Sequence, residues 1–319
     1  MISTIAGVFA VSAGPHAGTD PSMMIDLFTY YATIPQQWGA LSPIINPRGR
    51  GTGAAAHDLA MAPVNGAIVH GLSSRRLGVD VPPEVIASFV NQRPTTRLGM
   101  VGIDPLDPGW EATIEHAIEL GLHGVTISPT LAGFHPAHTR AMQLYAYCQD
   151  HGLPLFVAST TPLPTDAELS LGAPHLFDEV ALAFPELRIV LSGCGGPFWP
   201  QAVAMIAKHP HVYADLSFLA QRPMTLYHLL SDAIASGADD RLFLASGFPA
   251  STPEDIIEAL YSIPMMLKGT FLPPIPRRTV QSIVERDPLP LLQLPPLDQP
   301  DPAPDNEGVA LEEFDDELV

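Results

Sequence analysis

The fold is decided by residues 184–216, which read FPELRIVLSGCGGPFWPQAVAMIAKHPHVYADL. Two short, mainly apolar runs, Leu187–Leu191 and Val212–Leu216, flank a stretch of helical length, Pro200–His209. Mainly apolar strands of this kind are typical of a sheet with both faces covered, and a strand, helix, strand order is typical of a parallel sheet. This segment therefore predicts one βαβ unit.

From about Val64 onward, short apolar runs alternate in the same way with amphipathic stretches of helical length. Eight strands with intervening helices favour a closed (β/α)₈ barrel, an α/β fold in one domain, over an open sheet. The expected strands are Ile5–Val11, Gly66–His70, Arg97–Ile103, Gly124–Ser128, Leu153–Ala158, Leu187–Leu191, Val212–Leu216 and Leu242–Ser246. The expected helices are Gly109–Leu120, Ala137–His151, Pro200–His209, Met224–Ser236 and Pro253–Tyr261, three of them closed by a glycine.

Two regions do not fit the repeat. Residues 21–56, with several aromatic side chains and a Gly-rich part, are expected to form an excursion after strand one, over the barrel mouth. Residues 287–319 are Pro-rich and acidic, so we expect a disordered tail after a barrel formed by residues 1–286.

Composition excludes some classes of partner. The chain of 319 residues has 15 basic and 34 acidic residues, and its net charge of −19 disfavours nucleic acid and anionic membrane. No apolar run reaches the length of a membrane span. Cys148 and Cys194 provide no disulfide framework, and Met1–Ala10 lacks the basic region of a signal peptide, so a cytoplasmic location is expected.

Residues 104–260 carry a specific succession of motifs. It resembles the amidohydrolase-related family of metal-dependent hydrolases and decarboxylases that includes aminocarboxymuconate-semialdehyde decarboxylase. The motifs that carry the resemblance are Asp104-Pro105, Gly121–Val125, Phe184–Leu191 with Gly195–Pro197, His209–Ser217 and Asp240–Pro249.

The resemblance implies a divalent metal, usually zinc, at the carboxyl ends of the strands. In that family a His-x-His on strand one, a His on strand five and an Asp on strand eight hold the ion, and a His after strand six commonly completes the site. The ion makes a bound water acidic enough to ionise near neutrality. This chain departs from the pattern at every one of these positions. The residues that we expect in place of the ligands are Ser12, Gly14, Ala158, Gly193 and Gly247.

A substitute metal site has weaker candidates. His135 and His138 on a loop after strand four, with His175 and Asp215, could supply ligands. The favoured interpretation is that these are loop histidines at the start of a helix. His70 ends strand two, where a hydrogen-bonded barrel histidine is the more common finding.

Two further motifs have mainly structural interpretations. Cys194 lies among glycines at a strand end, where backbone amides could activate a thiol, but no base is assigned to it. Arg48 and Arg50 alternate with glycines but lack the strand-then-helix setting of a phosphate loop.

We therefore expect no catalytic residues, cofactor or metal, and a pseudoenzyme acting as a binding or structural subunit, as a homo-oligomer or with an active paralogue. The alternative is a hydrolase or decarboxylase that uses a relocated metal or a non-metal mechanism. Because packed interiors rarely leave empty volume, Tyr30, Tyr31 or Trp38 are expected to fill the mouth.

Residues 309–319 end the acidic tail. Leu311, Phe314 and Leu318 fall at i, i+3 and i+7, one face of a helix, with acidic residues on the others. One hypothesis is that this tail docks into the groove of a protein partner. The other is an acidic tail with incidental hydrophobic residues.

Overall fold

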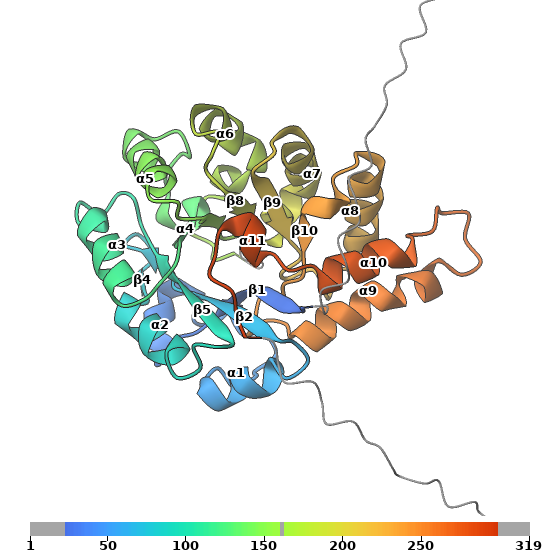
Figure 1. Ribbon diagram of the computed structural model, residues 1–319, viewed down its shortest axis with the longest axis horizontal. Coiled ribbons are helices and arrows are strands. Elements are labelled where there is room, and N and C mark those ends of the chain that lie inside the picture. The colour runs from blue at the N-terminus through green and yellow to red at the C-terminus, as the bar shows by residue number, and fades with distance from the viewer. Residues whose placement is uncertain (1–22, 160–162, 299–319) are drawn as a thin grey trace, which may run out of the picture.

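The computed structural model describes residues 23–159 and 163–298. Eight parallel strands form a barrel with helices around its outside (Figure 1). The backbone closes the barrel between β10 and β1, because Leu27 and Tyr30 donate to the carbonyls of Leu244 and Phe248. The barrel strands are β1 (Ile25–Tyr30), β2 (Gly66–His70), β5 (Arg97–Gly102), β6 (Val125–Ile127), β7 (Leu155–Val157), β8 (Ile189–Leu191), β9 (Val212–Asp215) and β10 (Leu242–Phe243).

The outer helices follow the strands in sequence, as the sequence pattern predicted. The helices are α1 (Ala54–Ala60), α2 (Pro83–Val90), α3 (Trp110–Glu119), α4 (Pro129–Ala132), α5 (Thr139–Asp150), α6 (Asp178–Ala183), α7 (Trp199–Lys208), α8 (Pro223–Ala235), α9 (Pro253–Leu267), α10 (Arg277–Glu285) and α11 (Leu289–Leu292). Each of the five predicted helices is confirmed within a few residues at its N-terminal end, and α9 continues past the predicted Tyr261 to Leu267. None of the helices in the described part of the chain is long and apolar enough to cross a bilayer.

Strand one lies elsewhere than predicted. The barrel begins with β1, inside the segment 21–56 that we expected to be an excursion, and the other seven strands are confirmed. Residues 5–11 lie outside the described residues. The part of the excursion after β1 does cross the mouth: the 3₁₀ helix η1 (Pro35–Leu41) contacts the small hairpin of β3 (Ser73–Ser74) and β4 (Val79–Asp80).

The start that we predicted for the disordered tail, residue 287, is too early in the chain. Residues 287–298 are ordered, and α11 lies across the end of the barrel where the strands begin (Figure 1). Asp298 donates its backbone N–H to the carbonyl of Thr95, just before β5. The physical reason is a set of buried leucines that the acidic composition concealed: Leu289, Leu292, Leu294 and Leu297.

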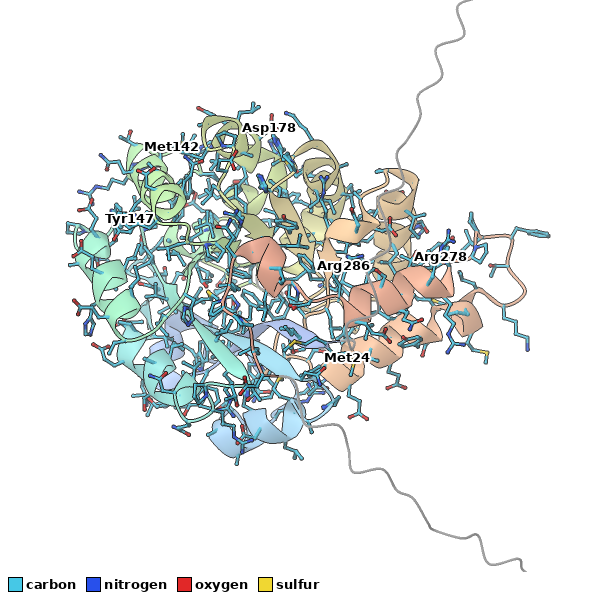
Figure 2. The ribbon with its side chains drawn as sticks, viewed as in Figure 1. Met24, Met142, Tyr147, Asp178, Arg278 and Arg286 are labelled. Carbon is cyan, nitrogen blue, oxygen red and sulfur yellow. The ribbon has the colours of Figure 1, made fainter. Side chains whose placement is uncertain are left out.

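The helix α10 is held to the barrel by Arg286, which follows it (Figure 2). Its guanidinium donates to the backbone carbonyls of Asp239 and Leu242, at 3.1 and 2.9 Å, at the start of β10. These bonds satisfy two backbone carbonyls at and just before the start of β10.

Candidate functional site at the barrel mouth

The side chains of β1 alternate between the inside and the outside of the barrel. The Thr29 hydroxyl donates to the Ile68 carbonyl at 3.0 Å and lies 3.1 Å from Nε2 of His57, which belongs to α1 outside the barrel. Because successive side chains of a strand point to opposite faces, Phe28 and Tyr30 point into the barrel. Their exposed fractions are 0% and 1%.

Aromatic rings fill the mouth. The centroid of the Phe28 ring lies 4.9 Å from that of Tyr30 and 6.2 Å from that of Phe218. The ring centroids of Tyr30 and Trp38 of η1 are 5.6 Å apart. We call Phe28, Tyr30, Trp38 and Phe218 the aromatic plug. Edge-to-face arrangements at these distances stabilise beyond the burial of the rings alone. The prediction that aromatic residues fill the mouth is confirmed for Tyr30 and Trp38, whereas Tyr31 instead stacks on Phe89 of α2 at 3.8 Å.

Phe218 occupies the space beside two glycines at strand ends. A Cβ on Gly247 would lie 2.6 Å from the Phe218 ring, and one on Gly193 would lie 3.4 Å from it. The Phe218 backbone has a φ of 65°, unusual for a residue with a side chain. The sequence analysis did not predict that Phe218 lies in the mouth. The available signal was its position just after the predicted strand 212–216, because residues that follow barrel strands lie at the mouth.

Two carboxylates are buried inside the barrel. Asp215 Oδ1 accepts from the Gly193 N–H, the Ser217 N–H and the Ser217 hydroxyl at 2.8, 3.0 and 2.6 Å. Asp26 Oδ1 accepts from the Ser246 and Phe28 N–H groups at 2.9 and 3.2 Å. The second oxygen of each carboxylate has no hydrogen-bond partner among the described residues.

Burial sets the protonation of these groups. It raises the pKa of Asp26 to about 7, with a smaller contribution from the negative charge of Asp215. Burial also raises the pKa of Asp215 and of Tyr30. Desolvation disfavours the charged form of an acid, so these groups tend to hold their protons.

His70 is a hydrogen-bonded barrel histidine, as the favoured interpretation predicted. Its Nδ1 lies 2.7 Å from the Thr126 hydroxyl and its Nε2 lies 3.0 Å from the Leu27 carbonyl. A carbonyl only accepts, so Nε2 carries the proton and Nδ1 accepts from Thr126. Burial lowers the pKa of His70 to about 3, and Phe28 stacks on its ring at 4.1 Å. With both nitrogens engaged, the imidazole has no free lone pair for a metal.

Cys194 lies in a buried setting that disfavours a thiolate. The thiol is fully buried and donates to the Asp215 carbonyl at 3.2 Å, and burial raises its pKa well above the usual value. A thiol that keeps its proton is a poor nucleophile. Its φ of 49° places it in a tight left-handed turn, as the structural interpretation predicted.

The histidines of the loop after β6 accept hydrogen bonds from nearby backbone N–H groups and so stabilise local turns. Nδ1 of His135 accepts from the Ala137 N–H, and Nδ1 of His138 accepts from the Arg140 N–H as the N-cap of α5. His175 is exposed and bonds to Gln201. Within residues 23–159 and 163–298, no three His, Cys, Asp or Glu side chains are grouped to hold a metal ion.

The two loop arginines are engaged with α9. Arg48 and Arg50 both contact the Asp255 carboxylate, at 3.2 and 2.7 Å. They therefore tie the long loop after η1 to the start of α9.

The residues at the mouth do not fit the metal that the resemblance implies. The structure places strand one at β1, so the inward pair with His-x-His spacing at its carboxyl end is Phe28 and Tyr30, and Ser12 and Gly14 lie outside the described residues. Ala158, Gly193 and Gly247 have no side-chain donor atom, whereas zinc needs nitrogen, sulfur or oxygen ligands. A restored side chain at Gly247 would also collide with Phe218.

Comparison with known proteins agrees with this architecture. A solved structure of an uncharacterised TIM-barrel protein from Bordetella bronchiseptica is similar, with a TM-score of 0.65 and 18% identity over 85% of this chain and 98% of that one. So is an amidohydrolase from Burkholderia multivorans with bound zinc, with a TM-score of 0.64 and 13% identity over 86% and 100% of the chains. A 2,6-dihydroxybenzoate decarboxylase from Rhizobium has a TM-score of 0.59 and 15% identity over 86% and 99%.

These likenesses show the fold alone. None of the curated proteins matches the chain significantly. A family model described as amidohydrolase matches residues 44–270, most of the described barrel. The chain belongs to the amidohydrolase family.

Proposed function

We propose that this protein is a metal-free member of its family that serves as a binding or structural subunit. One observation supports the proposal: the aromatic plug lies at the carboxyl ends of the strands, with Phe218 beside Gly193 and Gly247, two positions where the resemblance implies polar site residues. Phe28 has no metal-binding atom, and Tyr30 has only a buried phenol. The barrel can persist without the metal because its core packs independently of it.

Metal analysis tests the proposal. Protein purified without chelators and then dialysed should contain zinc and manganese far below one ion per chain, because the mouth offers no set of three or four ligands. The measurement is elemental analysis by mass spectrometry, with the final dialysis buffer as the blank. A tightly held ion at one per chain would overturn the proposal and favour an enzyme with a relocated metal.

A subunit of this kind needs a partner. We propose a second copy of the chain or an active paralogue, and a cytoplasmic location, which two free and buried cysteines support. The tail of residues 309–319 lies outside the described residues, and we propose that it docks on a protein partner through Leu311, Phe314 and Leu318.

A pull-down from source lysate tests the tail. Truncation must follow Asp298, because Leu297 is buried against the barrel. Full-length protein should recover partners that the truncation and Phe314→Ala lose, and recovery should fall with added salt because acidic residues flank the apolar ones. Equal recovery by all three proteins would show that the tail has no docking role.

A further inference from the structure

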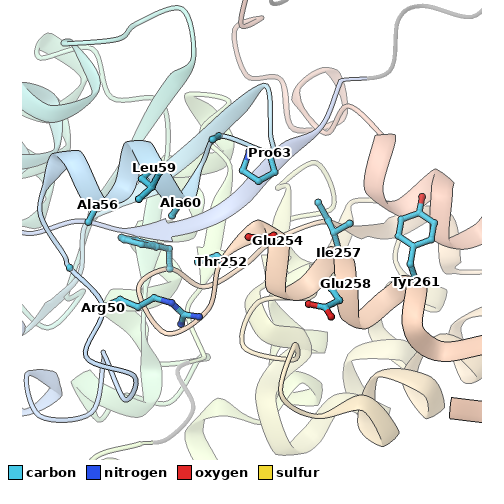
Figure 3. Close-up of a pocket in the computed structure, with 13 residues that line it drawn as sticks. Arg50, Ala56, Leu59, Ala60, Pro63, Thr252, Glu254, Ile257, Glu258 and Tyr261 are labelled. Atoms are coloured by element: carbon cyan, nitrogen blue, oxygen red, sulfur yellow. The ribbon is translucent and has the colours of Figure 1, made fainter. Parts of the chain in front are cut away.

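A groove of about 790 Å³ runs between α1 and α9 on the outside of the barrel (Figure 3). Ala56, Leu59 and Ala60 of α1 face Ile257 and Tyr261 of α9 across it. Leu59 is 79% exposed and Tyr261 is 41% exposed. A concave surface lined mainly by apolar side chains is typical of a site that binds another segment.

The charges on the groove wall indicate which occupant fits. Glu254 and Glu258 of α9 line it. Arg50, the cation among the lining residues, is already bonded to Asp255 at 2.7 Å and to the Ala250 carbonyl at 2.8 Å. An acidic peptide such as residues 309–319 would be repelled, whereas an uncharged apolar segment would be accepted.

The described chain begins beside this groove. Met24 lies at the start of the structure (Figure 2). It donates its N–H to Asn65 Oδ1 at 2.7 Å, and its carbonyl accepts from the Asn65 and Gly66 N–H groups. Asn65 lies two positions after Pro63, which lines the groove. These bonds fix the point where residues 1–22 join the barrel.

The preceding residues have the matching chemistry. Residues 2–13, ISTIAGVFAVSA, contain no charged side chain. The barrel already has eight strands and closes between β10 and β1, so it offers this segment no ladder position. The connecting residues 14–22 can span roughly 30 Å when extended, which is enough to run along a helix the length of α9.

We propose that residues 2–13 of the same chain occupy the α1–α9 groove. Ile5, Val8 and Phe9 provide apolar side chains that cover Leu59 and Tyr261, and Glu254 and Glu258 exclude the acidic tail. The inference does not depend on the absence of catalysis at the barrel mouth.

Disulfide trapping tests the position of the segment. The variant Val8→Cys/Leu59→Cys is oxidised with copper phenanthroline at several protein dilutions, and the products are separated by non-reducing electrophoresis and weighed intact. The native Cys148 and Cys194 are fully buried, so they do not compete. Val8→Cys/Leu182→Cys is the matched control, because Leu182 of α6 is also well exposed, at 64%.

The expected result is a disulfide within one chain in most molecules of the Leu59 pair, independent of dilution, and little in the Leu182 pair. Equal trapping by the two pairs would overturn the proposal. So would a disulfide between chains, which would make a second copy the occupant.

A second experiment uses no cysteine. Protein lacking residues 1–13 should bind a synthetic peptide of residues 2–13, seen as a change in peptide fluorescence anisotropy, and the full-length chain should bind it several-fold more weakly. Leu59→Glu in the shortened protein should abolish binding and Leu182→Glu should not. Equal binding by the full-length and shortened proteins, or by both Glu variants, would contradict the proposal.

Discussion

Replacing Asp26 with Asn is expected to stabilise the protein by roughly 4 kcal/mol at pH 8 and to leave it little changed at pH 4. Burial raises the pKa of this carboxyl from 3.8 to about 7, so the folded protein holds a proton that the unfolded chain releases more readily. The contribution of the neutral acid to stability is present in full below pH 3.8 and is lost as pH rises to 7. An amide carries no charge and removes this loss.

The geometry favours the substitution. Asn retains one oxygen to accept from the Ser246 and Phe28 N–H groups, and its NH₂ replaces the carboxylate oxygen that has no partner among the described residues. The measurement is urea unfolding followed by circular dichroism across pH 4 to 8. Asp80→Asn is the control, because Asp80 is exposed on β4. A loss of stability of equal size at every pH would mean that the charged form is accommodated and the prediction fails.

Asp26 also explains why the first strand could not be predicted. A strand buried on both faces usually reads as an apolar run, and the apolar residues 5–11 fitted that pattern better than β1. Asp26 is 0% exposed within β1. The acid accepts a hydrogen bond from the Ser246 N–H, far along the chain, and local sequence does not reveal this contact.

The seven later strands were predictable because each is short and mainly apolar and is followed by a helix that a glycine or a proline bounds, even though β9 also carries a buried acid, Asp215. The aromatic plug was only partly predictable. The vacated volume at Gly193 and Gly247 was evident from the sequence, but its occupant depends on the backbone of Phe218, which turns the ring inward at positive φ. Local sequence favours no such conformation in a phenylalanine.

Restoring the aspartate that the resemblance implies on strand eight, Gly247→Asp, is expected to destabilise the protein by about 3 to 5 kcal/mol and to yield no metal-dependent activity. Gly247 has a φ of 73°, which strains any side chain, and a Cβ there would meet Phe218 at 2.6 Å. One carboxylate also leaves the other ligands missing, and zinc needs three or four.

A matched glycine separates the two causes. Gly269 has a φ of 80° and nothing within 4 Å of its Cβ, so Gly269→Asp carries the backbone strain alone and should cost about 1 to 2 kcal/mol. The destabilisation by Gly247→Asp beyond that by Gly269→Asp then measures the collision with the plug. In a Phe218→Ala background, the loss of stability caused by Gly247→Asp should fall toward the loss caused by Gly269→Asp. Urea unfolding of the four variants with and without zinc measures both terms. If Gly247→Asp costs no more than Gly269→Asp, Phe218 does not fill the mouth; if zinc stabilises Gly247→Asp, a ligand set survives there and the metal-free proposal is wrong.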